Sequence, residues 1–247
     1  MYICVYDEVD STNKIAKNFI SSDISSFNNF GFLSYIQTQG VGKLSNKWLS
    51  FKNNLHLSLV FKQGVYFNDL KNIGLISLLI AISIKNTLSN YIQDDTIEFK
   101  WPNDVLVNKK KISGILIEIE SNKLNQQYII IGIGVNLIDY PKDTSYDAIS
   151  VYEITKKKID VLDFAHMLSI NIIDNFKKMN ANIIDIKDLW MQSAYGLQNE
   201  IIIKNQGSIK KGLFKDLTPE GFLILNTKGK DEIITTTDIF NIQANNE

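Results

Sequence analysis

A lysine and a carboxylate flanking a short turn are the residues of this sequence best suited to chemistry on an anionic substrate. Asp104 ends the stretch 100–104, in which Pro102 fixes the backbone of a turn, and Lys111 begins the return segment. A hairpin with this spacing brings carboxylate and ammonium face to face, where they could manage an anion and a metal ion. Gly114 would let a ligand approach the backbone closely. A plain Pro-Asn-Asp turn explains any one of these residues, so the interpretation depends on the whole pattern.

Three other segments offer polar atoms or exposed backbone. Residues 10–13, Asp-Ser-Thr-Asn, present short side chains with donors and acceptors, although they are also typical of a helix N-cap. Residues 37–43 contain two glycines, whose backbone amides can wrap phosphate or carboxylate oxygens. Residues 132–136, Gly-Ile-Gly-Val-Asn, end an apolar strand. They lack the third glycine and the following helix of a dinucleotide fingerprint.

Hydrophobic periodicity predicts the elements that position these segments. Alternation over 54–61 predicts a strand on which His56 is half-exposed, and His166 falls on the polar side of a helix, so both histidines are interpreted as structural. Strands are expected at 2–5, 32–37, 54–61, 97–100, 105–107, 112–118 and 128–135, and helices at 14–20, 68–91 and 160–178. Short strands at 200–204, 209–214, 221–226 and 232–236, separated by turns, predict a small β-barrel.

Taken together, these motifs resemble the signature of biotin–protein ligases, in which Lys-Trp-Pro-Asn-Asp precedes a Lys-x-x-Gly-Ile-Leu-x-Glu strand. The matching residues here are 100–104 and 111–118. The resemblance implies an α+β fold, with a mixed-sheet catalytic domain of the biotin/lipoyl ligase type over 1–195 and a small SH3-like β-barrel over 196–247. It also implies an ATP-dependent ligase that forms biotinyl-5'-AMP and transfers biotin to a lysine of a biotin carboxyl carrier protein.

The resemblance also assigns roles to individual residues. Catalysis would fall to Lys111, Asp104 and Lys43, and Mg²⁺ would be held by substrate phosphates, with Asp104 as a candidate protein ligand. Biotin would be bound by Ser11, Thr12, Asn13, Gln37, Gly40, Val41, Gly42, Lys43, Lys111, Gly114 and Ile115. ATP would be bound by Lys100, Asn103, Asp104, Asn136 and Trp48.

One segment departs from the family pattern. Family members usually have Gly-Arg-Gly-Arg in the glycine-rich loop, whereas this chain has Val41 and Lys43 at the arginine positions and Leu-Ser-Asn at 44–46, where the family tends to be basic or glycine-rich. The whole chain contains lysine but no arginine, and lysine supplies a charge without the bidentate fork. Two interpretations follow: an active ligase in which Lys43 substitutes, or a catalytically weak biotin-binding module. A lipoate or octanoate transferase is a third, although those relatives lack the hairpin at 100–104.

Composition sets the remaining expectations. A net charge of −1 argues against nucleic-acid and membrane partners, and one cysteine fits a reducing compartment. The longest apolar run, 73–84, is too short to span a bilayer and predicts a buried helix. The N-terminus does not read as an export signal, so a cytoplasmic location is expected. A preceding winged-helix domain has no room in this chain, and the protein is expected as a monomer or homodimer.

Overall fold

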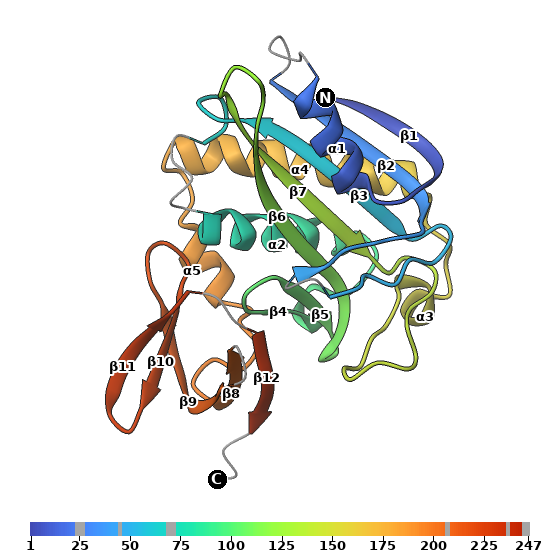
Figure 1. Ribbon diagram of the computed structural model, residues 1–247. Coiled ribbons are helices and arrows are strands. Elements are labelled where there is room, and N and C mark those ends of the chain that lie inside the picture. Colours follow the sequence, from blue (N-terminus) through green and yellow to red (C-terminus); the bar gives the residue numbers. More distant parts are fainter. Residues whose placement is uncertain (23–27, 44–45, 68–72, 206–207, 236–237, 244–247) are drawn as a thin grey trace.

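The computed structural model describes residues 1–22, 28–43, 46–67, 73–205, 208–235 and 238–243. Seven strands form one mixed sheet: β1 (Tyr2–Val9), β2 (Asn29–Gln37), β3 (Leu55–Lys62), β4 (Ile97–Lys100), β5 (Asp104–Val107), β6 (Lys110–Ser121) and β7 (Gln127–Val135). Their spatial order is β1-β2-β3-β7-β6-β5-β4, with β1 and β2 parallel and the other neighbours antiparallel (Figure 1). The expected mixed α+β architecture is confirmed.

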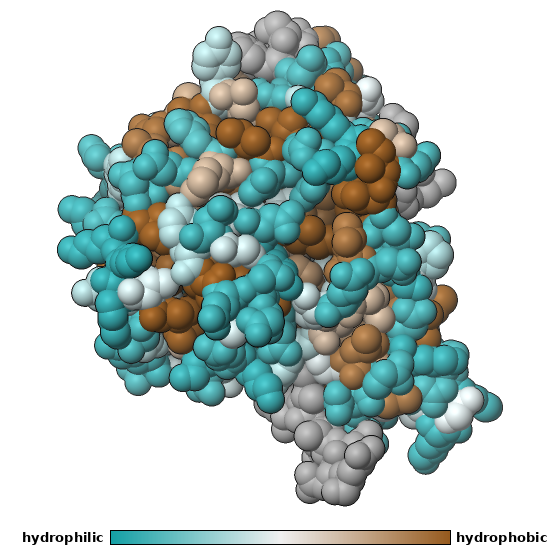
Figure 2. All heavy atoms as spheres, turned by 180° about the vertical axis from the view of Figure 1, so that it is seen from behind, coloured by the Kyte–Doolittle hydropathy of each residue, from teal (hydrophilic) through white to brown (hydrophobic). Residues whose placement is uncertain are grey.

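Helices cover both faces of this sheet. They are α1 (Thr12–Ser21), α2 (Ile73–Leu88), α3 (Val151–Thr155), α4 (Val161–Asn180) and α5 (Ile186–Met191), with a short 3₁₀ helix η3 at Asp94–Thr96. On one face, Ala16 and Ile20 of α1 pack against Val60 of β3. On the other, Leu59 of β3 belongs to the large core that includes α2 and α4. Seen from behind, the surface intersperses hydrophilic and hydrophobic residues (Figure 2).

This coverage explains one wrong expectation. Strand β3 lies between β2 and β7, and Leu55–Phe61 is buried without interruption. His56 is therefore 1% exposed rather than half-exposed. Alternation along a strand separates two faces, but it indicates exposure only where one of those faces meets water. His166, by contrast, is exposed on α4 as expected.

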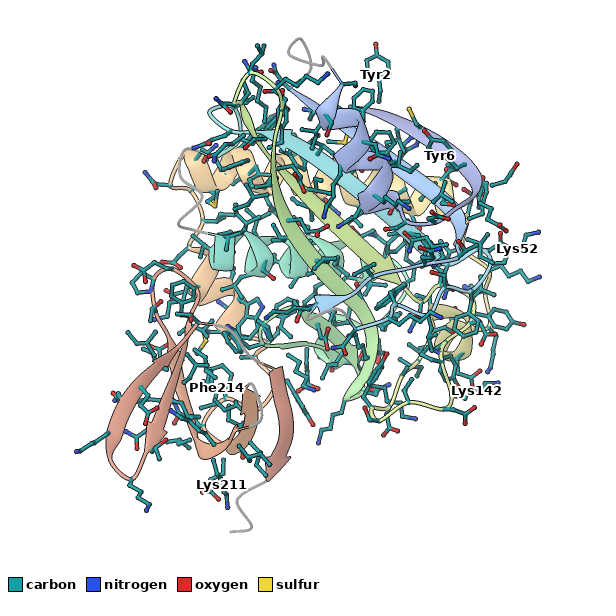
Figure 3. The ribbon with its side chains drawn as sticks, viewed as in Figure 1. Tyr2, Tyr6, Lys52, Lys142, Lys211 and Phe214 are labelled. Atoms are coloured by element: carbon teal, nitrogen blue, oxygen red, sulfur yellow. The ribbon has the colours of Figure 1, made fainter. Side chains whose placement is uncertain are left out.

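The C-terminal strands form a second, antiparallel sheet of five strands: β8 (Glu200–Asn205), β9 (Ser208–Leu217), β10 (Leu223–Thr227), β11 (Lys230–Ile234) and β12 (Asp238–Gln243). Their order is β11-β10-β9-β8-β12, and within the described part of the chain the edge strands β11 and β12 do not pair, so no closed barrel is seen. Phe214 is buried, and Lys211 is exposed and points away from this sheet (Figure 3). The division at 195/196 stays a prediction.

Trp101 links the two sheets. Its indole Nε1 donates to the carbonyl of Gly221 at 3.0 Å, and its side chain is buried in the shared core. Gly221 has φ +84°, a conformation that favours glycine, and a Cβ on it would lie 3.0 Å from the backbone of Gly74 in α2, which is a tight contact. The Trp101–Pro102 peptide is cis. The tryptophan of the hairpin motif therefore anchors the C-terminal sheet against the larger one.

Other expectations hold with small shifts. Helix α2 is buried as expected but ends at Leu88 rather than at 91, and α3 and α5 were not anticipated. No described helix is long and apolar enough to cross a membrane. Three parts of the expectations lie outside the described residues: 44–45 of the glycine-rich loop, 68–72 at the expected start of α2, and 236 at the end of an expected strand.

Candidate functional site

One line of paired residues crosses five strands of the large sheet. The register joins Ser34 to His56, His56 to Gly134, Gly134 to Gly114, and Gly114 to Asp104. Directly paired residues project to the same face of a sheet. Because the two middle positions are glycines, this face is hollowed between His56 and Asp104. The hollow lies on the same face as α1, since Ser58 and Gly132, two positions further along β3 and β7, meet the start of that helix.

The hollow forms a cavity of about 810 Å³, within the range expected for small-molecule sites. Every residue to which the resemblance assigned a role lines it, except Gly40 and Asn136. The lining residues beyond those are Asn46, Lys47, Leu49, His56, Leu106, Lys109, Leu116, Gly132, Ile133, Gly134, Thr144, Ser145, Tyr146, Asp147 and Tyr195.

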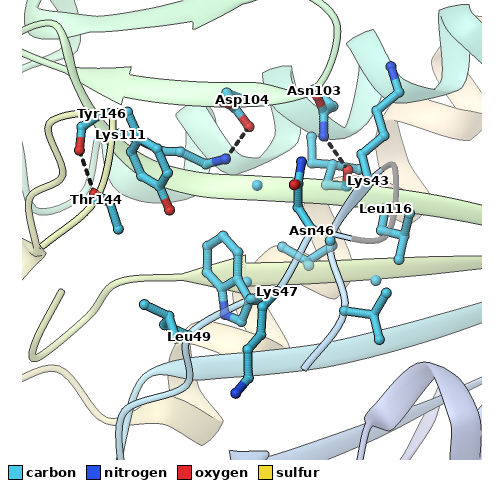
Figure 4. A pocket seen from close by; sticks show the side chains of 18 of the residues that line it. Lys43, Asn46, Lys47, Leu49, Asn103, Asp104, Lys111, Leu116, Thr144 and Tyr146 are labelled. Atoms are coloured by element: carbon cyan, nitrogen blue, oxygen red, sulfur yellow. Dashed lines mark hydrogen bonds and ion pairs between the residues drawn. The ribbon is translucent and has the colours of Figure 1, made fainter. Parts of the chain in front are cut away.

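The hairpin β5–β6 forms the wall with the reactive charges. Lys111 Nζ lies 2.7 Å from Asp104 Oδ1, and both side chains are less than one fifth exposed (Figure 4). The same ammonium lies 5.7 Å from the Trp48 ring centroid and 5.2 Å from that of Tyr146. Asn103 Nδ2 donates to the Ile115 carbonyl at 2.7 Å, which closes the turn. The predicted pairing of the Asp104 carboxylate with the Lys111 ammonium is thus present, and both residues lie on the paired strands β5 and β6.

The start of α1 forms a second wall. Ser11 occupies the N-cap position, but its side chain makes no capping hydrogen bond. Thr12 donates through its backbone N and Oγ1 to Gln37 Oε1, at 2.8 and 3.1 Å. Asn13 Nδ2 donates to Glu118 Oε2 at 2.8 Å. These side chains are therefore held by distant strands, which the helix-cap interpretation does not account for.

The glycine-rich loop forms the third wall. Its ends are joined by bonds from Trp48 N to the Gly40 carbonyl at 3.0 Å and from Gly42 N to the Asn46 carbonyl at 2.7 Å. A Cβ on Gly40 would lie 2.6 Å from the Trp48 carbonyl oxygen, so this glycine shapes the loop without lining the cavity. Lys43 Nζ lies 5.9 Å from the Trp101 ring centroid, on the hairpin side of the cavity (Figure 4).

Trp48 covers the glycine floor of the cavity, which is formed by Gly114 and Gly134. A Cβ on Gly134 would lie 2.3 Å from two indole carbons, and one on Gly114 would lie 3.0 Å from a third. Only glycine at position 134 allows the ring to lie against the sheet, and a side chain at 114 would crowd it. The close approach expected at Gly114 is therefore made by a side chain of the protein itself. The indole Nε1 is buried and has no hydrogen-bond partner among the described residues.

Asn136 lies in a small recess beside the main cavity. Trp48, Lys111 and Tyr146 also line this recess. Asn136 is 2% exposed, and its Nδ2 donates to the Ile149 carbonyl at 3.2 Å. Its Oδ1 has no partner within the described part of the chain, so a buried acceptor is left unsatisfied there. Asn136, to which the resemblance assigns ATP binding, thus lies next to the cavity rather than in it.

Several site residues were missed by the sequence reasoning. His56 lines the cavity, and burial lowers the pKa of its imidazole to about 4 because the charged form loses hydration. Glu118 accepts from Asn13 and from Lys17, and it raises the pKa of Lys17 by hydrogen bonding. Glu118 ends the hairpin motif, so its position was available as a signal. Tyr146 comes from an irregular segment that carried none.

Known ligases resemble this chain over much of its length. A family model described as the biotin/lipoate A/B protein ligase family matches residues 5–136, just over half of the chain. The bifunctional ligase/repressor BirA of Bacillus spizizenii is 27% identical over 209 residues, covering 82% of this chain and 63% of that protein. The match thus spans less than two thirds of that relative. A biotin--[acetyl-CoA-carboxylase] ligase of Mycobacterium tuberculosis is 23% identical over 219 residues, covering 84% of this chain and 77% of the relative.

Solved structures agree with the architecture. The biotin protein ligase from Aquifex aeolicus in complex with biotin and ATP superposes with a TM-score of 0.79 at 25% identity, covering 98% of each chain. A structure from Helicobacter pylori, described as biotin acetyl coenzyme A carboxylase synthetase with bound biotinylated ATP, has a TM-score of 0.60 at 17% identity and is similar in fold. It covers 94% of this chain and 99% of that one.

Proposed function

Since residues 5–136 match its model, the chain belongs to the biotin/lipoate A/B protein ligase family, and we propose that it activates biotin with ATP and transfers it to a lysine of a biotin carboxyl carrier protein. The observation that carries the proposal is the convergence of the α1 start, the glycine-rich loop and the β5–β6 hairpin on one cavity. That cavity pairs a charged end at Lys111 with a polar end at Ser11. Biotin has the same polarity, with a carboxylate at one end and a ureido ring at the other.

The first step is adenylation. A carboxylate oxygen of biotin attacks the α-phosphorus of ATP, the bond to the bridging oxygen breaks, and pyrophosphate leaves. Negative charge accumulates on the phosphate oxygens as this happens, and preorganised positive groups stabilise it. Lys111, fixed by Asp104 at 2.7 Å, and Lys43 supply that charge, with the amides of the glycine-rich loop. Asn103, Lys100 and Trp48 complete the nucleotide side of the cavity.

The recess beside Asn136, about 10 Å³, is too small for a whole base, so Asn136 would contact only an edge of the adenine or the ribose of ATP. The buried Oδ1 without a partner among the described residues is an acceptor that suits an exocyclic amine, and an unmet acceptor in a buried site is costly. The recess adjoins Lys111, so base and phosphates would lie in continuous space. Tyr146, on the same recess, offers an aromatic face.

Magnesium fits this donor set as a substrate-borne ion. Among the described residues, no group of three histidine, cysteine, aspartate or glutamate side chains could hold a metal. Mg²⁺ commonly takes one or two protein carboxylates and completes its shell with phosphate oxygens and water. Asp104 is the candidate carboxylate. When bound, the ion would neutralise phosphate charge, which is also the role of Lys111 and Lys43.

The second step joins biotin to its carrier. The ε-amine of the carrier lysine attacks the carbonyl carbon of the mixed anhydride, an amide forms, and AMP leaves. The amine must be neutral to attack, whereas a free lysine is largely protonated at neutral pH. Asp104, which lines the cavity, would accept that proton or orient the amine. Holding both reactants in one site supplies much of the remaining rate.

The direct test is incubation of the chain with ATP, labelled biotin and a biotin-carrier domain. Label on the carrier is the expected result. Biotin retained on the protein without transfer would instead indicate a binding module. Transfer of lipoate or octanoate in place of biotin would indicate the neighbouring transferase activity of the family.

A further inference from the structure

His56 is a buried polar residue that the two steps of ligation leave unused. It lies on β3, is 1% exposed, and lines the cavity. Its ring Nδ1 lies 3.2 Å from the carbonyl oxygen of Ser34, while its Nε2 is buried and has no hydrogen-bond partner among the described residues. A buried nitrogen without a partner costs about 1–3 kcal/mol, and a donor on a bound ligand would recover that cost.

The bond to Ser34 determines what the free nitrogen can do. A carbonyl oxygen only accepts, so Nδ1 must carry the hydrogen of the imidazole. Burial keeps the ring neutral by lowering its pKa to about 4. In a neutral ring with hydrogen on Nδ1, Nε2 is an acceptor. His56 therefore presents a lone pair on the wall of the cavity.

The place of this lone pair follows from the sheet register. His56 pairs with Gly134, and Gly134 pairs with Gly114, which pairs with Asp104. Three strand spacings, roughly 14 Å across the sheet, separate His56 from Asp104, whose carboxylate holds Lys111. The imidazole thus bounds the glycine floor at the end opposite the adenylation charges, on the side of α1.

Three other polar side chains at that end are hydrogen-bonded to protein groups, whereas Ser11 makes no capping hydrogen bond. Thr12 Oγ1 donates to Gln37 Oε1, Asn13 Nδ2 donates to Glu118, and Ser58 Oγ lies within bonding distance of both Thr12 and Asn13. A ureido ring brings two N–H donors and one carbonyl acceptor into this space. At that end, His56 offers in Nε2 an acceptor that no donor among the described residues is bonded to.

We infer that His56 is a specificity-determining residue, whose Nε2 accepts a hydrogen bond from a ureido N–H of the bound biotin ring. The inference rests on the proposed function and deepens it by naming how the acyl substrate is recognised. The acyl chains of lipoate and octanoate carry no N–H group. With lipoate or octanoate bound, Nε2 would stay buried without a hydrogen-bond donor. A site built to accept from a donor discriminates strongly against ligands that have no such donor. His56 thus selects biotin within a family that also handles lipoyl groups.

Two substitutions separate recognition from packing. His56→Phe keeps a buried ring and removes the acceptor, whereas His56→Gln keeps an amide oxygen that can accept. His166→Phe makes the first change on the exposed face of α4 and serves as the matched control. Each full-length variant is compared with the wild type for ATP–pyrophosphate exchange with biotin and desthiobiotin, which both retain the ureido ring. Octanoate is tested as a competitive inhibitor, and thermal melting verifies folding.

The expected result is a rise in KM of about 10-fold to 100-fold for both ureido ligands in His56→Phe, with the inhibition constant of octanoate unchanged. His56→Gln should stay within about 5-fold of the wild type, and His166→Phe should match it. An equal loss for octanoate and biotin would show a structural role and overturn the inference, as would an unchanged KM in His56→Phe or an equal defect in His56→Gln. Failure of the wild type to exchange with biotin would instead contradict the proposed function.

Discussion

The hairpin wall and the loop wall of the cavity are held in different ways. Lys111 and Asp104 sit on paired strands whose register continues across the sheet to β2. The loop at 40–48 is closed by a few backbone bonds and by Trp48 lying on glycines, and Val41 in it is 51% exposed. Lys111 and Asp104 therefore lie on the rigid wall, whereas Lys43 and the covering Trp48 lie on the looser one.

The departures from the family pattern also follow this difference. Both positions where arginine is usual, Val41 and Lys43, lie on the looser wall, whereas the hairpin motif is intact. Side chains on the loop segments 40–43 and 46–48 are placed by a few backbone bonds. Side chains on the strand pair are instead placed by the register of the whole sheet. Substitutions on the two walls should therefore differ in effect, from a large loss on the rigid wall to a small one on the loop.

Loss of the ammonium on the rigid wall should have the largest effect. Lys111→Ala should lower the rate of ATP–pyrophosphate exchange about 10³-fold, because it removes a preorganised charge from the phosphate site. Lys110→Ala, one residue earlier on β6 and exposed, is the matched control and should stay within about twofold. Normal exchange in Lys111→Ala would remove the basis for placing adenylation at this hairpin.

A side chain at position 134 should break the contact of the loop wall, through Trp48, with the sheet. Gly134→Ala puts a methyl group 2.3 Å from the indole carbons of Trp48, so the ring must move off the sheet. Exchange should fall about 10²-fold, since small displacements of positioning groups carry large kinetic costs. In a Trp48→Ala background the same change should add little, because the clash is gone. Additive losses in the double variant would show that Gly134 acts independently of the loop.

The buried imidazole on β3 should make folding sensitive to pH. Its pKa is about 4 when folded and about 6.5 when unfolded, so the unfolded state binds a proton first as pH falls. Stability is complete above pH 6.5 and decreases between 6.5 and 4. From pH 7.5 to pH 5 the free energy of unfolding should decrease by about 2 kcal/mol from this group, about 30-fold in the folding equilibrium.

Urea denaturation at the two pH values measures that change. His56→Phe lacks the titrating group and should show a correspondingly smaller decrease between pH 7.5 and pH 5. The difference between the two proteins isolates His56 from the carboxylates, which titrate in both. Equal decreases in wild type and variant would mean that the imidazole is not neutral and buried in the folded protein.

Changes in the loop charge should have the smallest effect. Lys43→Ala should lower exchange about 10-fold, and Lys43→Arg should leave it unchanged or raise it about threefold, because guanidinium adds a second donor to the same oxyanion. Lys52→Ala, exposed and outside the cavity, should behave as wild type. A loss in Lys43→Ala as large as that in Lys111→Ala would abolish the proposed distinction between the walls.

Much of the chemistry is predictable from the amino-acid sequence. The hairpin at 100–118 is expected with its carboxylate and ammonium opposed, because turn chemistry and strand alternation act over a few residues. The strands of both sheets and the buried helix α2 follow from the same local signals, within a few residues at their ends. The glycines at 132–134 mark a strand end, although nothing local indicates what they leave room for.

The sequence by itself determined which segments carry chemistry, since residue type and short spacing govern turns, strands and motifs. Only the tertiary structure decided how those segments meet. Asn13 bonds Glu118 across 105 positions, and Trp48 rests on Gly134. His56 is buried because β3 has neighbours on both sides and helices over its two faces, which alternation along one strand cannot reveal. Its free acceptor arises from the same sheet order, since burial and register depend on contacts between segments far apart in the chain.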